Sequence, residues 1–223
     1  MTEQDENTIA RERMVANQIS NRGIEDDRVL DAMRSIPRHL FVPSERRHLA
    51  YSDAPLPIGH RQTISQPYIV ALMTDLLKLK GDEIVLEIGT GSGYQAAILS
   101  RLVQKVYSLE RIEALADQAK GILRSLELEN VEVVIGDGTQ GLPEHAPYQA
   151  IIVTAAAPEV PNPLKGQLAE GGRLVLPVGG QMGQILESWR READRFIRES
   201  VAPVAFVPLI GEHGWPSDER NLP

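Results

Sequence analysis

The sequence predicts an α/β fold: a Rossmann-like, doubly wound, mostly parallel sheet with an antiparallel C-terminal strand pair and an N-terminal helical extension. Three observations favour it. Apolar runs alternate with helical patterns from residue 84 onward, the first run breaks into a glycine-rich turn, and the chain closes with two apolar runs joined by a charged segment. With 223 residues, we expect a single domain over residues 1–223, made of an extension (1–80), a nucleotide-binding core (81–210) and a tail (211–223).

In the N-terminal part, the sequence pattern predicts three helices and one irregular segment. The first seven residues are polar and are expected to fray. Helical patterns cover residues 8–19, 26–35 and 68–79, and Pro37 ends the second of them. The stretch 41–61 holds three prolines and a glycine, so we expect ordered but irregular structure there.

The core predicts strands and helices in alternation. Residues 84–88 form an Ile/Val/Leu-rich run that is typical of a parallel strand buried on both faces. By the same pattern we expect further strands at 105–110, 131–135, 150–154 and 173–178, helices at 94–102, 111–126 and 163–168, and a final antiparallel pair at 184–189 and 204–209. A dinucleotide-binding fold would instead continue with another βαβ half.

The composition narrows the classes of partner. There are 31 acidic and 23 basic residues, a formal charge of −8, which disfavours a nucleic-acid-binding surface. The chain has no cysteine, and its histidines show no metal-ligand spacing, so we expect no disulfide and no metal site. No signal peptide or long apolar segment is evident, and we expect a cytoplasmic monomer that does not contact membranes.

The first strand leads into three glycines spaced two apart, Gly89, Gly91 and Gly93. Glycines at a strand-to-helix turn let the backbone approach a ligand closely. The dinucleotide fingerprint is G-x-G-x-x-G, so the spacing here counts against NAD. A tight turn without a ligand remains the alternative.

Acidic residues follow the next two strands. Glu110 lies about 20 residues after the first glycine, the position of a ribose-binding acid, although it could also be an exposed acid opening a helix. Asp137 stands between Gly136 and Gly138 and could hold a purine amino group, or simply form a turn. The carboxyl ends of parallel strands meet at one crevice, which favours the nucleoside interpretation of both residues.

The glycine loop resembles that of class I S-adenosylmethionine-dependent methyltransferases, and most of the chain resembles the protein-L-isoaspartate O-methyltransferase family. The most specific segments are residues 59–67 (GHRQTISQP) and 153–158 (VTAAAP). Segments 14–19, 37–43, 176–179 and 206–209 also resemble the family, so the resemblance spans roughly residues 10 to 215 by motif reading.

The resemblance implies methyl transfer from S-adenosylmethionine, which leaves S-adenosylhomocysteine, to the free α-carboxylate of L-isoaspartyl residues in damaged proteins and peptides. It implies that the catalytic residue is Ser65 and that substrate contacts come from Ile64, Ser65, Val178 and Gly179. The implied cofactor-binding residues are Thr63, Ile64, Glu87, Gly89, Thr90, Gly91, Ser92, Gly93, Glu110, Arg111, Asp137, Gly138 and Gln184. Segment 211–215 is a candidate cover for the peptide site.

Several alternatives stay open. Ser65 precedes Pro67 and could be the N-cap of the following helix rather than a substrate contact. The segment 154–158 offers no acid or histidine, which fits a substrate that arrives as a carboxylate, ionised at neutral pH with a pKa near ~4. A methyltransferase of another substrate class, an NAD-dependent oxidoreductase and a binding module without turnover are the competing functions.

Overall fold

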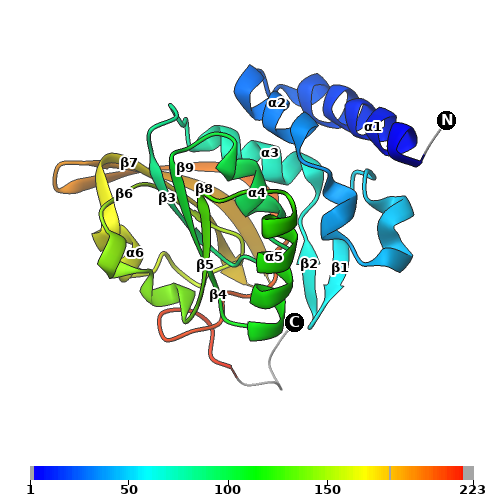
Figure 1. Cartoon of the computed structure of the whole chain (residues 1–223). Helices are drawn as coiled ribbons and strands as arrows, with labels where there is room; N and C mark the ends of the chain where they lie inside the picture. The colour runs from blue at the N-terminus through cyan, green and yellow to red at the C-terminus, as the bar shows by residue number, and fades with distance from the viewer. Residues whose placement is uncertain (1–2, 181, 218–223) are drawn as a thin grey trace.

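The computed structural model describes residues 3–180 and 182–217. Its centre is a seven-stranded sheet with the strand order β5-β4-β3-β6-β7-β8-β9 (Figure 1). The strands are β3 (Ile84–Ile88), β4 (Lys105–Glu110), β5 (Val131–Ile135), β6 (Tyr148–Val153), β7 (Leu168–Gly180), β8 (Gly183–Glu192) and β9 (Arg195–Val204). The first five are parallel, and β8 lies between β7 and β9 and runs antiparallel to both. The predicted fold class is confirmed.

Successive side chains of the central strands point to opposite faces and build two cores. On β3, Val85 belongs to the core beneath α3 (Pro67–Leu76), α4 (Tyr94–Ser100) and α5 (Glu113–Ser125). Leu86 and Ile88 belong to the core on the opposite face, which α6 (Asn162–Gln167) covers through Leu164. Burial on both faces explains why these strands read as continuous apolar runs.

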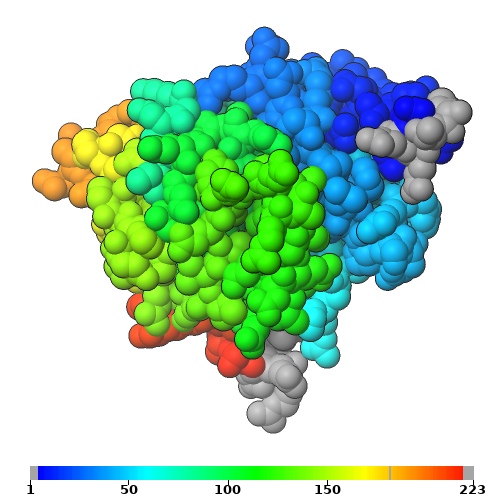
Figure 2. All heavy atoms as spheres, viewed as in Figure 1, coloured from blue at the N-terminus to red at the C-terminus, as the bar shows by residue number. Residues whose placement is uncertain are grey.

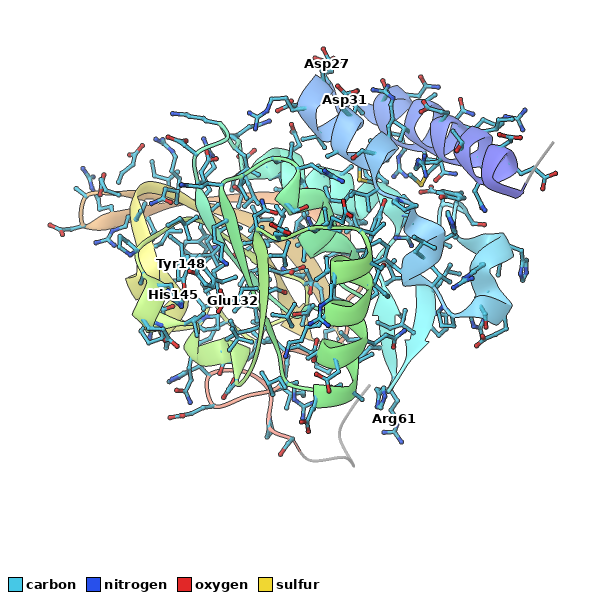
Figure 3. All side chains as sticks on the ribbon, in the orientation of Figure 1. Asp27, Asp31, Arg61, Glu132, His145 and Tyr148 are labelled. Carbon is cyan, nitrogen blue, oxygen red and sulfur yellow. The ribbon has the colours of Figure 1, made fainter. Side chains whose placement is uncertain are left out.

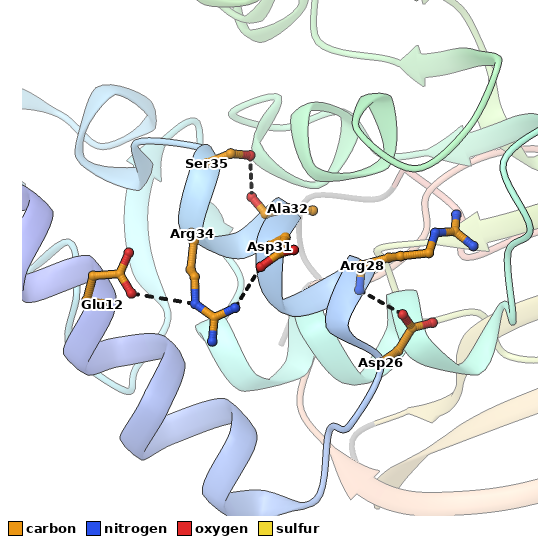
Figure 4. Close-up of polar contacts among 7 residues, drawn as sticks. All are labelled: Glu12, Asp26, Arg28, Asp31, Ala32, Arg34 and Ser35. Atoms are coloured by element: carbon orange, nitrogen blue, oxygen red, sulfur yellow. Dashed lines mark hydrogen bonds and ion pairs between the residues drawn. The ribbon is translucent and has the colours of Figure 1, made fainter.

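The N-terminal extension begins with α1 (Glu3–Met14), a π-helical turn (Val15–Ile19) and α2 (Asp27–Ser35). Arg34 on α2 pairs with Glu12 on α1 at 3.5 Å and with Asp31 at 2.8 Å, and Asp26 caps α2 by accepting a hydrogen bond from the backbone N–H of Arg28 (Figure 4). Of these contacts, only the Arg34–Glu12 pair joins the two helices, and the other two stabilise α2 itself.

The extension also packs on the helix that follows the glycine loop. The guanidinium of Arg38 is fully buried and lies 4.9 Å from the centroid of the Tyr94 ring, and Phe41 meets the same ring edge-on. In the space-filling view the extension covers the upper right of the molecule without a break from the core (Figure 2). Tyr94 opens α4, so these contacts steady the end of the glycine loop.

Three predictions about the secondary structure are wrong. Residues 3–7 are not frayed, because α1 already begins at Glu3, while residues 1–2 of the segment expected to fray lie outside the described residues. The irregular stretch 41–61 contains a strand, β1 (Leu56–Gly59), which pairs with β2 (Gln62–Ile64) in a separate hairpin. The last strand is β9 (Arg195–Val204), not 204–209, because the charged segment itself forms the edge of the sheet.

The remaining predicted elements are present. Where their bounds differ from the prediction, the difference is at the ends of the element, whose positions are set by capping and by strand register. For example, β7 starts at Leu168 and not at Arg173, because residues 168–172 extend its pairing toward Tyr148. Within the described residues no helix is long and apolar enough to cross a membrane.

Candidate functional site

The glycine loop between β3 and α4 requires its glycines. Gly89, Gly91 and Gly93 have φ angles of +93°, +53° and +87°, in the left-handed region that side chains disfavour. A Cβ on Gly89 would lie 2.5 Å from Oγ1 of Thr154, and one on Gly93 would lie 3.1 Å from the Cβ of Ala119. The loop is therefore pressed against its neighbours from two sides, while a Cβ on Gly91 would meet only Ile58, at 3.5 Å.

Glu110, at the end of β4, closes on this loop. It is 6% exposed, so it is not the exposed helix-opening acid that was the alternative. Its Oε2 accepts a hydrogen bond from the backbone N–H of Gly91 at 2.8 Å, and its Oε1 accepts one from Ile112 at 2.9 Å. A carboxylate oxygen has two lone pairs, so each oxygen of Glu110 keeps one acceptor position beside the loop.

Glu87, on β3, is fully buried on the sheet face that α4 covers. Its Oε2 accepts a hydrogen bond from Ser108 Oγ on β4 at 2.5 Å, and Oγ1 of Thr90 lies 2.6 Å from the same Ser108 oxygen. Its Oε1 has no partner. Desolvation raises the pKa of Glu87 to about 8, although the Ser108 hydrogen bond acts in the opposite direction.

Asp137 and Gly138 follow β5 on the adjacent strand end. The backbone N–H of Gly136 donates to the carbonyl of Glu110 at 3.0 Å, which places the two acidic loops side by side. Gly138 is buried, and a Cβ there would lie 2.3 Å from Cγ2 of Ile88. The backbone after β5 is thus packed closely against the end of β3.

Ser65 follows the β1–β2 hairpin and is half-buried. The N-cap of α3 is Gln66, whose side chain makes no capping hydrogen bond to the helix, so the alternative of Ser65 as helix N-cap is wrong. The hairpin reaches the glycine loop through Ile58, the side chain that a Cβ on Gly91 would touch. At the hairpin tip, Arg61 points away from the ribbon (Figure 3).

The end of β7 and the start of β8 complete this edge of the sheet. Gly179 has a φ of +127° and donates its backbone N–H to the carbonyl of Ala157 at 2.9 Å. Val178 pairs with Ala157 through a β-bridge. The side-chain amide of Gln184 is engaged with Phe206, accepting from its N–H at 2.6 Å and donating to its carbonyl at 3.0 Å.

The structure thus brings most of the predicted site residues to one edge of the sheet. Ile64 and Ser92 are also buried, whereas Thr63 and Arg111 are exposed at the surface. Sequence reasoning missed Ser108 and the tie of Thr154 Oγ1 to the Gly89 carbonyl at 2.6 Å. A signal for Ser108 was available, since it is a polar residue inside an apolar run that pairs with Glu87.

Comparisons with known proteins show the family of the chain. The family model described as protein-L-isoaspartate(D-aspartate) O-methyltransferase matches residues 9–214. A protein-L-isoaspartate O-methyltransferase of Geobacter metallireducens is 56% identical over 212 residues, covering 95% of this chain and 98% of that protein. One of Methanoregula boonei is 57% identical over 205 residues, with 92% and 94% covered.

Solved structures give the same result. A protein-L-isoaspartate O-methyltransferase aligns with a TM-score of 0.83 and 31% identity, over 92% of this chain and 67% of that one. A Plasmodium falciparum protein described as a member of the same family, solved in complex with S-adenosyl-L-homocysteine, aligns with a TM-score of 0.78 and 26% identity, over 90% of this chain and 98% of that one. The chain therefore belongs to the protein-L-isoaspartate(D-aspartate) O-methyltransferase family.

Proposed function

We propose that the carboxyl edge of the sheet binds S-adenosylmethionine in an extended pose, with the methionine end at the glycine loop, the ribose at Glu110 and the adenine at Asp137. As a member of its family, the chain transfers a methyl group from this donor to the free α-carboxylate of L-isoaspartyl residues in damaged proteins, which starts their repair. The residues at this edge fit such a ligand, as the following contacts indicate.

Glu110 gives the strongest support for a bound ribose. It is a buried carboxylate whose two oxygens are held by the backbone N–H groups of Gly91 and Ile112, and each oxygen retains one free acceptor position. Two neighbouring hydroxyl donors, such as those of a ribose, match this pattern. The backbone contact with Gly91 also ties the ribose position to the loop that approaches the rest of the ligand.

Glu87 supports a cationic ligand. Its Oε1 is buried without a partner, next to a network that ends at Thr90 in the glycine loop. An unpaired buried carboxyl oxygen costs free energy that a nearby positive charge would offset. S-adenosylmethionine carries two such charges, on its sulfonium and on its ammonium group.

The substrate side of the site offers positioning and no base. Ala155, Ala156 and Ala157 after β6 are buried, and the backbone N–H groups of Ala156 and Ala157 are engaged with Val207 and Pro177. A carboxylate substrate has a pKa near ~4 and needs no deprotonation at neutral pH. When bound, the donor supplies an electrophilic methyl group, and the protein has only to align the nucleophilic oxygen with it and exclude water.

Within this scheme Ser65 orients the substrate carboxylate. Ser65 directly follows the β1–β2 hairpin, whose Ile58 lies near Gly91 of the glycine loop, and its hydroxyl is not used to cap α3. Ile64, Val178 and Gly179 would form the walls around the peptide. The absence of cysteine is compatible with a cytoplasmic enzyme.

Transfer of label from methyl-tritiated S-adenosylmethionine to a matched pair of peptides tests the function. We expect base-labile label on the isoaspartyl peptide and background on the aspartyl peptide. Equal labelling of both peptides would contradict the substrate assignment. A lack of binding heat with S-adenosylhomocysteine, together with nicotinamide binding, would instead favour the oxidoreductase alternative.

A further inference from the structure

The segment after β9, residues 206–215, contacts the loops that follow the carboxyl ends of β6 and β5, and we call it the C-terminal strap. It lies along the lower edge of the molecule, in red, in Figure 1. After β6, the backbone of Ala156 accepts from Leu209 N–H at 2.8 Å and donates to Val207 at 2.8 Å. The indole N–H of Trp215 donates to the same Ala156 carbonyl at 3.0 Å. The strap is therefore anchored beside the proposed substrate loop.

The strap folds back on itself between Leu209 and Trp215, and its tip, at Glu212 and His213, is bonded to Asp137 and Thr139 after β5. The backbone N–H of Glu212 donates to Asp137 Oδ2 at 2.8 Å. The backbone N–H and the hydroxyl of Thr139 donate to Oδ1 at 2.9 and 2.7 Å, and Thr139 Oγ1 accepts from His213 N–H at 3.0 Å. The carboxylate of Asp137 and the hydroxyl of Thr139 therefore both accept a hydrogen bond from the strap.

These contacts leave Asp137 one free acceptor position. Both lone pairs of Oδ1 are used by Thr139, and one of the two on Oδ2 is used by Glu212. Desolvation alone would raise the pKa of Asp137, but the hydrogen bonds from Glu212 and Thr139 lower it, so the group stays ionised and accepts hydrogen bonds only. The exocyclic amino group of adenine is a donor of the matching kind.

We propose that the C-terminal strap positions Asp137 for selection of the base, so that the enzyme distinguishes adenine from a purine that carries a carbonyl in place of the amino group. This inference rests on the proposed function, in which Asp137 contacts the base. The residue through which it acts is Gly211, because a Cβ there would lie 2.0 Å from Asp137 Oδ1. Gly211 is a positioning residue, since it reaches the ligand only through Asp137.

The test compares the dissociation constants of S-adenosyl-L-homocysteine and S-inosyl-L-homocysteine, measured by titration calorimetry on the full chain. Wild type should favour the adenosyl ligand by about 10- to 100-fold, the range of one hydrogen bond to a charged group. Gly211→Ala should push the strap away from Asp137 and reduce this ratio at least about fivefold, with the affinity for the inosyl ligand little changed.

Two further variants keep the test sharp. Thr139→Val removes the hydroxyl that links Asp137 to His213 without adding bulk, and it should lower the ratio in the same way even if Gly211→Ala does not fold. Gly121→Ala on α5 has no atom within 4 Å of its new Cβ and serves as the control, with an unchanged ratio.

The outcomes separate the two proposals. If wild type binds both ligands equally, Asp137 does not read the base, and the proposed pose fails together with the role of the strap. If wild type discriminates and both Gly211→Ala and Thr139→Val discriminate equally well, the pose stands and the strap has no part in base selection. An equal loss of affinity for both ligands also overturns the strap proposal, since it reveals a structural role only.

Discussion

Ser108 Oγ lies 2.5 Å from Glu87 Oε2, across two neighbouring parallel strands, and it is the only side chain among the described residues that hydrogen-bonds this buried carboxyl. On the other flank of Glu87 the paired residue is Ile152, which offers no polar group. The negative charge of Glu110 also acts on Glu87 and raises the pKa of Glu87 further. Glu87 is therefore held in a site that favours its neutral form as long as no cation is near.

This arrangement predicts a pH-dependent stability. The folded-state pKa of Glu87 is about 8, above its ordinary value of 4.5, so the folded protein binds the proton more tightly than the unfolded chain does. Stability should then fall as the pH rises from 4.5 to 8, by an amount on the order of 4 kcal/mol. Glu87→Gln cannot ionise and should lose this part of the pH dependence.

Urea denaturation of both proteins without ligand, at about pH 5 and about pH 8, measures the effect. The variant and wild type should be of similar stability at the lower pH, and the variant should be the more stable one at the higher pH. Ser108→Ala is the matched control, because loss of its hydrogen bond should raise the pKa of Glu87 further. Parallel pH profiles for wild type and Glu87→Gln would contradict the assignment.

Ser65→Ala should separate activity from stability. Ser65 is not the N-cap of α3, so its removal should change the free energy of unfolding by less than about 0.5 kcal/mol. If its hydroxyl orients the substrate carboxylate, kcat/KM for an isoaspartyl peptide should fall by about 10- to 100-fold. Ser44→Ala, at an exposed serine of the extension, is the control. Wild-type kinetics at equal stability would remove Ser65 from the catalytic site.

The parallel part of the fold was predictable because burial on both faces leaves a plain record in the sequence. The buried strand β3 was predicted with its observed bounds, Ile84–Ile88. The edge strand β9 was not, because Arg195 to Val204 is largely exposed and its charges resemble a loop. The strand β1 was missed since it is short and contains Pro57, which reads as a turn signal. Pairing with distant segments decides such elements.

The candidate site was predictable to the extent that it follows strand ends. Glu110 is the last residue of β4 and Asp137 comes shortly after β5, and parallel strands bring their carboxyl ends together. Their partners were not predictable, because they come from loops far along the chain. Glu212 reaches Asp137 from 75 residues away through its backbone N–H, so the identity of its own side chain gives no signal for this contact.

Gly89→Ala should test how tightly the glycine loop is packed. The substitution forces a side chain into a φ of +93° and places its Cβ 2.5 Å from Thr154 Oγ1, so we expect a loss of about 2 to 4 kcal/mol in the free energy of unfolding. In a Thr154→Ala background the clash is absent and only the backbone strain remains. A double-mutant cycle from denaturant titrations should give a coupling of at least about 1 kcal/mol.

The control for the loop is Gly121→Ala, which should leave stability unchanged or raise it by up to about 1 kcal/mol, since Gly121 lies within α5 and has open space around it. Additive losses in the cycle would show that Thr154 does not confine Gly89. The strain at the glycine would then be the whole effect.

Asp137→Asn should change the response of the protein to acid. The pKa of Asp137 is lowered in the folded state from its ordinary value of 3.8: desolvation opposes the shift, and the hydrogen bonds from Glu212 and Thr139 produce it. The ionised carboxylate thus stabilises the fold fully above pH 3.8, and this contribution is lost as the pH falls through the lower folded-state pKa. Asparagine has no such contribution.

Wild type should therefore lose more stability than Asp137→Asn when it is acidified, and the gap between the two proteins should close below the folded-state pKa. Denaturant midpoints recorded from about pH 6 down to about pH 2.5 give this difference, in which the acid titrations of all other carboxylates cancel. The N–H of Glu212 is the largest of the contributions that lower the pKa of Asp137. Gly211→Ala should displace this N–H, and it should therefore reduce the loss of stability that Asp137 causes on acidification. If the difference in stability between wild type and Asp137→Asn stays constant over the whole pH range, the hydrogen bonds from the strap do not lower the pKa of Asp137 in solution.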